Sequence, residues 1–182
     1  AAIFFLGVNP NLEDPDLLRV TEALARSGVV VLLHRSGPLE EVRVTPEEVD
    51  ALVAAFQFLA RQPYVDVGRI GFAGFCVGGS LALLAAADSR IRDEVAFVNA
   101  FGAYFDLRDV VVAVATRRIS YAGVEETWEP QPLAVELLRR GVISALPDQQ
   151  DRAALGRLLS KDALATPEEL GAFSVEGRSA YG

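Results

Sequence analysis

The stretch Arg69–Asp88, RIGFAGFCVGGSLALLAAAD, runs from an apolar strand through a glycine-rich turn into an apolar helix. Cys76 stands in the turn and is the single cysteine of the chain. Gly74 and Gly78 flank it in the pattern G-x-C-x-G, which lets a chain pass sharply from a strand to a helix and holds the central side chain above the sheet edge. A helix N-terminus favours an anion, and a thiol attacks carbonyl groups as its anion. The pattern therefore predicts a nucleophile at Cys76, although a small buried hydrophobic side chain would fit the same position.

Strands and helices alternate around this turn. Apolar runs predict strands, and apolar residues at helical spacing predict helices of 10–16 residues between them. The residues Thr45-Pro46-Glu47-Glu48 are typical of a capping box at the start of one helix. The predicted strands are Ala2–Leu6, Val29–Leu33, Arg69–Phe75 and Glu94–Phe101, and the predicted helices are Asp16–Arg26, Pro46–Arg61 and Val77–Ala87. This order predicts an α/β fold, a mostly parallel sheet with helices on both faces.

The alternation stops after Phe101, and the rest of the sequence is mainly helical in pattern. Apolar residues recur at 110–114, 133–138 and 155–159, between turns that carry Pro, Asp and Gly. We expect residues 1–105 to form the α/β core. We expect residues 106–182 to form a helical excursion that packs on the sheet, not an independent domain.

The motif G-F-C-V-G-G at Gly74–Gly79 and the order of elements around it resemble the nucleophile elbow of the α/β-hydrolase fold. A cysteine at the elbow resembles the dienelactone hydrolase branch of that superfamily. The resemblance covers about residues 1–105 and implies strands three to six of an incomplete α/β-hydrolase fold. It also implies that the helical segment 106–182 is a cap over the active site.

This resemblance implies a role for each of several residues. Cys76 would attack an ester, thioester or lactone carbonyl and form an acyl-enzyme intermediate. The backbone N–H of Val77 points to where an oxyanion would develop. The family takes a second N–H from the loop after its third strand, which places Val8 in that role. These expectations describe a hydrolase that needs no cofactor.

A proton acceptor and an acid are also required for this chemistry. In the family the proton acceptor and the acid follow later strands, so we expect both outside this segment. The 182 residues contain no methionine, and we expect them to be a fragment of a longer chain. His34, the single histidine, precedes the nucleophile and is an alternative base, a structural residue or a substrate contact. Asp106 follows the last predicted strand and is a candidate acid, or else a helix cap. Further candidate substrate contacts are Asn9, Tyr104 and Trp128, for which ordinary packing is the alternative.

The composition argues against several other functions. The chain has 182 residues, a net charge of −8 and no basic cluster, so nucleic acid and anionic membranes are not expected partners. No apolar run reaches the roughly 20 residues of a membrane-spanning helix. One cysteine and no signal-like segment are typical of a cytoplasmic bacterial protein. Nucleotide-binding glycine motifs are missing, and one Cys and one His far apart in sequence do not predict a metal site.

The sequence thus predicts an enzyme for a small-molecule substrate, with the oligomeric state left open. Two other functions stay open as well. In a non-catalytic binding module of the hydrolase fold, the elbow would have a structural role alone. In a thiol redox sensor, Cys76 would be oxidised and reduced without ester turnover.

Overall fold

The computed structural model describes residues 1–160 and 165–181. The chain divides into two compact units, Ala1–Leu107 and Arg108–Gly182. No helix in these described ranges is long and apolar enough to cross a membrane.

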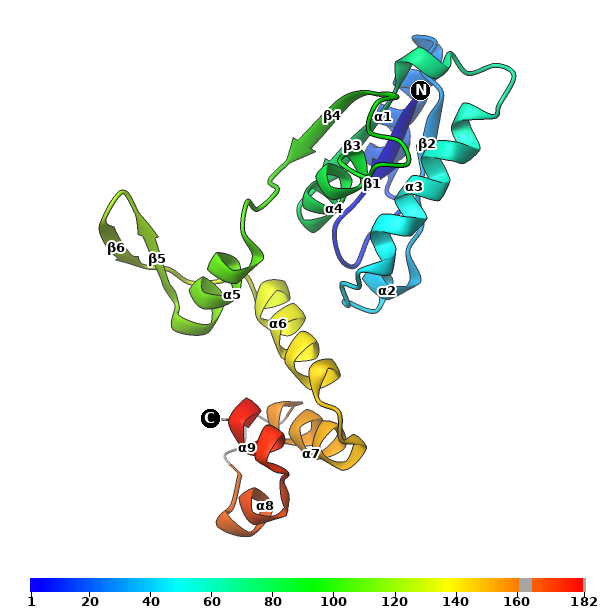
Figure 1. The fold of residues 1–182 in the computed structure, drawn as a ribbon. Coiled ribbons are helices and arrows are strands. Elements are labelled where there is room, and N and C mark those ends of the chain that lie inside the picture. The colour runs from blue at the N-terminus through cyan, green and yellow to red at the C-terminus, as the bar shows by residue number, and fades with distance from the viewer. Residues whose placement is uncertain (161–164, 182) are drawn as a thin grey trace. The chain divides into compact units, whose positions relative to one another are not determined.

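The first unit is built on a four-stranded sheet in the order β2-β1-β3-β4, with every neighbouring pair parallel (Figure 1). Its strands are β1 (Ala2–Phe5), β2 (Val31–Leu33), β3 (Ile70–Phe75) and β4 (Val95–Phe101). Each lies inside the corresponding predicted strand and is at most two residues shorter. Parallel strands need helical crossovers, and the predicted alternation supplies them. The predicted α/β class is therefore confirmed.

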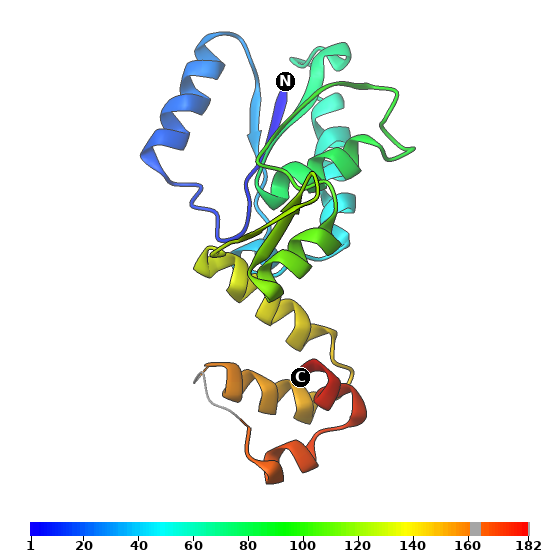
Figure 2. The same ribbon diagram turned by 90° about the vertical axis from the view of Figure 1, so that its left-hand side faces the viewer.

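Helices cover both faces of this sheet (Figure 2). α1 (Pro15–Arg26) packs through Leu17 and Leu24 on the face that carries Ala2, Phe4 and Ala73. α3 (Glu47–Ala60) and α4 (Val77–Ala86) cover the opposite face and form the main core. The largest side chains of this core that are almost fully excluded from solvent are Ile3, Phe5, Leu39, Leu52, Val53, Phe56, Ile70 and Phe72. Alternate residues of β1 thus enter opposite cores, as the two-residue period of a strand requires.

The predicted capping box at the start of α3 is wrong. α3 begins at Glu47 with Pro46 as its N-cap, and no side chain caps it. Glu48 instead lies on the buried face of the helix and accepts a hydrogen bond from Ser36. Ser36 is the N-cap of α2 (Gly37–Glu40), a short helix that was not predicted, and a 3₁₀ turn (Val67–Arg69) leads into β3.

Beyond α5 (Leu107–Thr116), a β-hairpin interrupts the second unit. It pairs β5 (Arg118–Tyr121) with β6 (Val124–Thr127) in antiparallel register. The two residues of its turn, Ala122 and Gly123, both have positive φ, which a two-residue hairpin turn of type I′ requires. The helical prediction for residues 106–182 missed this hairpin because Ala-Gly lacks the Asn-Gly or Asp-Gly signal of such turns.

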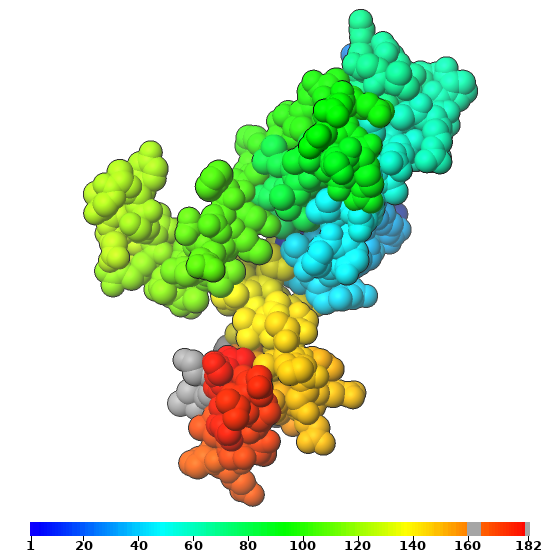
Figure 3. All heavy atoms as spheres, in the orientation of Figure 1, coloured from blue at the N-terminus to red at the C-terminus, as the bar shows by residue number. Residues whose placement is uncertain are grey.

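The other predicted helical stretches of the second unit are present. Residues 133–138 lie in α6 (Pro132–Ala145), and residues 155–159 lie in α7 (Gln149–Ser160). Two further helices follow, α8 (Pro167–Ala172) and α9 (Val175–Tyr181). A small core of Leu146, Leu155, Leu158 and Phe173 joins the C-terminal helices, whose clustering is visible in Figure 3. The expectation that residues 106–182 act as a cap and not as an independent domain stays a prediction.

Candidate active site

Cys76 occupies a sharp turn between β3 and α4. Its backbone has φ 55° and ψ −133°, a conformation that non-glycine residues rarely adopt. Its N–H donates to the carbonyl of Phe101 over 2.8 Å, and its carbonyl accepts from Gly79 N–H over 2.9 Å. Hydrogen bonds therefore hold the backbone of Cys76 on both sides. Cys76 is exposed, and its thiol is free.

The glycines of the elbow allow this turn by leaving room for backbone. A Cβ atom on Gly78 would lie 2.4 Å from the carbonyl oxygen of Phe5, and one on Gly74 would lie 2.5 Å from the Cα of Gly79. No real Cβ atom approaches backbone so closely, so α4 can begin directly against β1 and β3 only with glycine here. The spacing G-x-C-x-G-G is thus explained by close approach of the chain.

Val77 follows as the first residue of α4 and is buried. The first N–H groups of a helix have no acceptor within the helix, so the Val77 N–H is available to a developing negative charge beside the thiol. This position matches the predicted oxyanion role of Val77, which stays a prediction.

The loop after β1 lies against Cys76. A Cβ atom on Gly7 would be 2.9 Å from the Cβ and 3.4 Å from the Sγ of Cys76. Val8 follows and packs against the main core, and Asn9 is exposed with φ 52°. The structure thus brings the loop of the second predicted oxyanion donor to the nucleophile.

Tyr104 also belongs to the surroundings of Cys76. Burial raises the pKa of its phenol, the neighbouring Cys76 raises this pKa further, and Ser80 lowers it. The Ser80 hydroxyl donates to the Tyr104 carbonyl over 3.1 Å and accepts from its N–H over 3.0 Å. Ser80 is buried on α4, so it holds the loop after β4 next to the helix of the elbow.

His34 directly follows β2 at the same edge of the sheet. Its backbone N–H donates to the carbonyl of Phe4, and its half-buried ring meets the Phe5 ring edge-on at 5.1 Å between centroids. Burial lowers the pKa of the imidazole, and Glu48 partly opposes this by raising it. Because β1 lies between β2 and β3, two strand spacings of about 10 Å in total separate the strands of His34 and Cys76.

Two further predicted residues lie near or beyond the boundary between the units. Asp106 is exposed and directly precedes α5. Trp128 is half-buried in the second unit, where its backbone N–H donates to the carbonyl of Arg117 over 2.8 Å. It lines a hollow of about 550 Å³ together with residues of α5 and the hairpin. The roles of Asp106 as an acid and of Trp128 as a substrate contact stay predictions.

The sequence reasoning missed the buried pair Ser36 and Glu48, which lies next to His34. Glu48 is four residues before Leu52 and eight before Phe56, so helical spacing places it on the buried face. That spacing was the signal that could have identified it. Within the described residues, no group of three or more His, Cys, Asp or Glu side chains is arranged to hold a metal ion.

The class of protein that the elbow indicates is supported by comparison with known families. The model of the dienelactone hydrolase family matches residues 37–112, a range that includes the elbow and confirms the predicted resemblance.

One particular relative is a protein of Bradyrhizobium sp. named as a probable 2-oxo-3-(5-oxofuran-2-ylidene)propanoate lactonase. It is 33% identical to this chain over an alignment of 106 residues, and the match covers 50% of this chain and 41% of the relative. The chain thus spans less than half of that relative's length. No solved structure matches the chain.

Proposed function

We propose that this protein is a hydrolase that opens an ester or lactone bond of a small molecule through the thiol of Cys76. The observation that carries the proposal is the backbone of Cys76, with φ 55° and ψ −133° between β3 and α4. Such strain concentrates at functional sites, and here it belongs to an exposed thiol at the start of a helix. A thioester is the other substrate class that this chemistry serves.

The reaction has two halves. The Cys76 thiolate adds to the carbonyl carbon, and the carbonyl oxygen becomes an oxyanion that accepts hydrogen bonds from the N–H groups of Val77 and Val8. Collapse of this intermediate breaks the bond to the leaving oxygen. That oxygen takes the proton that the base removed from the thiol and leaves as an alcohol, or remains tethered when a lactone opens. Water then adds to the thioester, gives a proton to a base, and releases the carboxylic acid and the thiol.

The proton acceptor comes, in this proposal, from residues outside the 182 of this chain, and its acid comes either from there or from Asp106. His34 is a poor substitute because β1 separates its strand from that of Cys76 and its ring packs against Phe5. Asp106 is the candidate acid within the chain, directly before α5. Residues 106–182 would serve as the cap of the site.

A lactone is the substrate class we favour, because the Bradyrhizobium relative is named a lactonase. The proposed substrate contacts are Asn9, Tyr104, His34 and Trp128. The cytoplasmic location and the absence of nucleic-acid partners stay predictions from composition.

Mass spectrometry of the full-length protein after incubation with p-nitrophenyl acetate tests the proposal. We expect an adduct one acetyl group heavier that maps to Cys76, with release of nitrophenol, and no adduct in Cys76→Ala. Cys76→Ser is expected to keep part of the turnover because a hydroxyl at the elbow can attack the same carbonyl.

Two results would favour the other functions. Turnover that persists in Cys76→Ala would overturn the assignment of the nucleophile. An inert full-length protein would favour the binding module, and reversible oxidation of Cys76 by peroxide in that inert protein would favour the redox sensor.

A further inference from the structure

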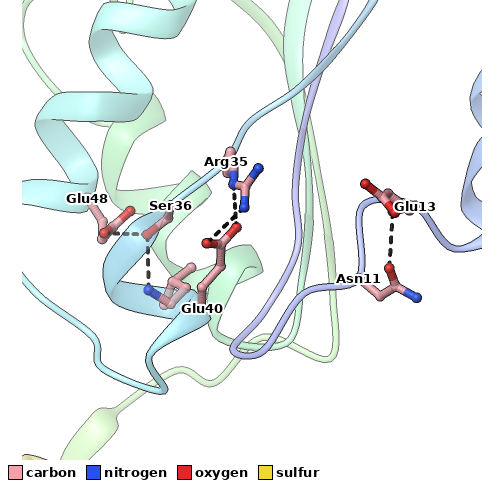
Figure 4. Close-up of polar contacts among 7 residues, drawn as sticks. Asn11, Glu13, Arg35, Ser36, Glu40 and Glu48 are labelled. Carbon is pink, nitrogen blue, oxygen red and sulfur yellow. Dashed lines mark hydrogen bonds and ion pairs between the residues drawn. The ribbon is translucent and has the colours of Figure 1, made fainter.

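A buried carboxylate lies close to the site without any role in the proposed reaction. Glu48 on α3 is only 4% exposed, and its Oε1 accepts a hydrogen bond of 2.6 Å from the Ser36 hydroxyl (Figure 4). Burying a carboxylate is costly unless hydrogen bonds replace the lost water. A carboxylate on the surface would not have this cost. The contacts that Ser36 makes explain why Glu48 is buried.

Ser36 connects Glu48 to α2. Its hydroxyl has one hydrogen, which is given to Glu48, so the oxygen lone pairs are left as acceptors. One of them accepts the N–H of Leu39 over 3.1 Å, as expected of an N-cap. Ser36 and Leu39 are 5% and 1% exposed, so water does not compete for these bonds. Glu48 thereby sets the direction of the hydroxyl that starts α2.

Leu39 in turn holds the loop after β1. Its carbonyl accepts the N–H of Asn9 over 2.8 Å. Asn9 has a φ of 52°, in the left-handed region that Asn tolerates better than most residues, and this hydrogen bond holds its backbone there. The preceding residues of the same loop are Val8 and Gly7, and Gly7 lies against Cys76.

We infer that Glu48 and Ser36 are positioning residues, which act through Leu39 and Asn9 to place the Val8 N–H beside the thiol of Cys76. The inference rests on the proposed hydrolase function for its catalytic consequence. The hydrogen-bond chain itself runs from α3 through α2 to the loop and does not depend on that function. An oxyanion donor must be held within about 0.5 Å of its productive position, and these hydrogen bonds hold the loop from the protein interior.

Hydrogen exchange and ester kinetics on the full-length protein test the inference together. Ser36→Gly removes the hydroxyl but keeps an acceptable N-cap, and Glu48→Ala removes the acceptor. Glu48→Gln keeps an acceptor oxygen and is the conservative rescue. Glu47→Ala is the matched control, because Glu47 is an exposed neighbour on the same helix turn.

In Ser36→Gly and Glu48→Ala we expect the Asn9 amide to exchange about tenfold faster, against less than about twofold in Glu48→Gln and Glu47→Ala. We expect kcat for p-nitrophenyl acetate to fall about tenfold in the first two variants with KM within about twofold. Alkylation of Cys76 by iodoacetamide forms no oxyanion, so its rate should stay the same in all four variants. A purely structural role would change the rate of alkylation as well as turnover.

Unchanged exchange at Asn9 in both disruptive variants would overturn the inference whatever the activity. Faster exchange with unchanged kcat would overturn the positioning role. If the unsubstituted protein hydrolyses no ester, the proposed function fails, and faster Asn9 exchange in the variants would still support the link from Glu48 to the loop. The two failures are therefore distinguishable.

Discussion

Gly7 and Cys76 are in contact across the carboxyl edge of the sheet, so closely that a Cβ atom on Gly7 would lie 2.9 Å from the Cβ of Cys76. The two residues come from different loops, one after β1 and one after β3, and these strands are neighbours in the sheet. The contact places the backbone of one loop beside the thiol of the other. An added methyl group between them has no room unless one loop moves.

Gly7→Ala is therefore expected to lower kcat strongly and the free energy of unfolding only slightly. The new Cβ displaces either the thiol or the loop of Val8, and we expect kcat to fall about tenfold or more because the oxyanion donor moves. Overpacking at this loop should reduce the free energy of unfolding by about 1 kcal/mol. Steady-state ester kinetics and urea unfolding measure the two effects. Turnover within twofold of the unsubstituted protein would contradict the role of this loop.

Gly78→Ala should destabilise the first unit strongly. Its Cβ would lie 2.4 Å from the carbonyl oxygen of Phe5, where neither helix nor strand can yield, and we expect a loss of about 3 kcal/mol. Gly68→Ala is the control, since its added Cβ makes an ordinary contact of 3.5 Å with the Asp66 side chain. Urea unfolding followed by circular dichroism compares the two. Equal stability of the two variants would show that the close approach at Gly78 is relieved at little cost.

The strain at Cys76 predicts that glycine is more stable there than alanine. Both substitutions remove the thiol, but only glycine adopts φ 55° and ψ −133° without steric cost. We expect Cys76→Gly to exceed Cys76→Ala in unfolding free energy by about 1–2 kcal/mol, with both variants inactive. Thermal and urea unfolding of the pair provide the measurement. A more stable alanine variant would mean that the elbow is not strained in solution.

The stability of the protein should decline at mildly acidic pH through His34. Burial lowers the pKa of this imidazole in the folded state, so the unfolded state binds more protons near the ordinary value of 6.5. The contribution is therefore fully present above about pH 6.5 and is lost as the pH falls through the lower folded-state pKa. Urea unfolding between about pH 5 and 8 should show that the free energy of unfolding falls more steeply with decreasing pH for the unsubstituted protein than for His34→Gln. Parallel pH profiles of the two proteins would refute this assignment.

The elements of the α/β core follow from local sequence signals. Continuous apolar runs such as Val29–Leu33 predict buried strands, and the glycines around Cys76 predict the elbow because backbone packing there excludes any larger residue. These signals lie within a few residues of the feature they predict. The hairpin at Arg118–Thr127 was not predicted, because its turn residues, Ala122 and Gly123, are not a strong turn signal.

By itself, the sequence determined the class of fold, the order of β1 to β4 with the helices α1, α3 and α4 between them, and the place of the thiol at a sharp turn. Only the tertiary structure decided that Glu48 turns inward to Ser36 instead of capping its own helix. It also decided that the loop of Gly7 meets Cys76 and that Asn9 is held by Leu39. The physical reason is sequence distance: these partners are 12 to 69 residues apart, and they meet because parallel strands bring their carboxyl ends to one edge of the sheet.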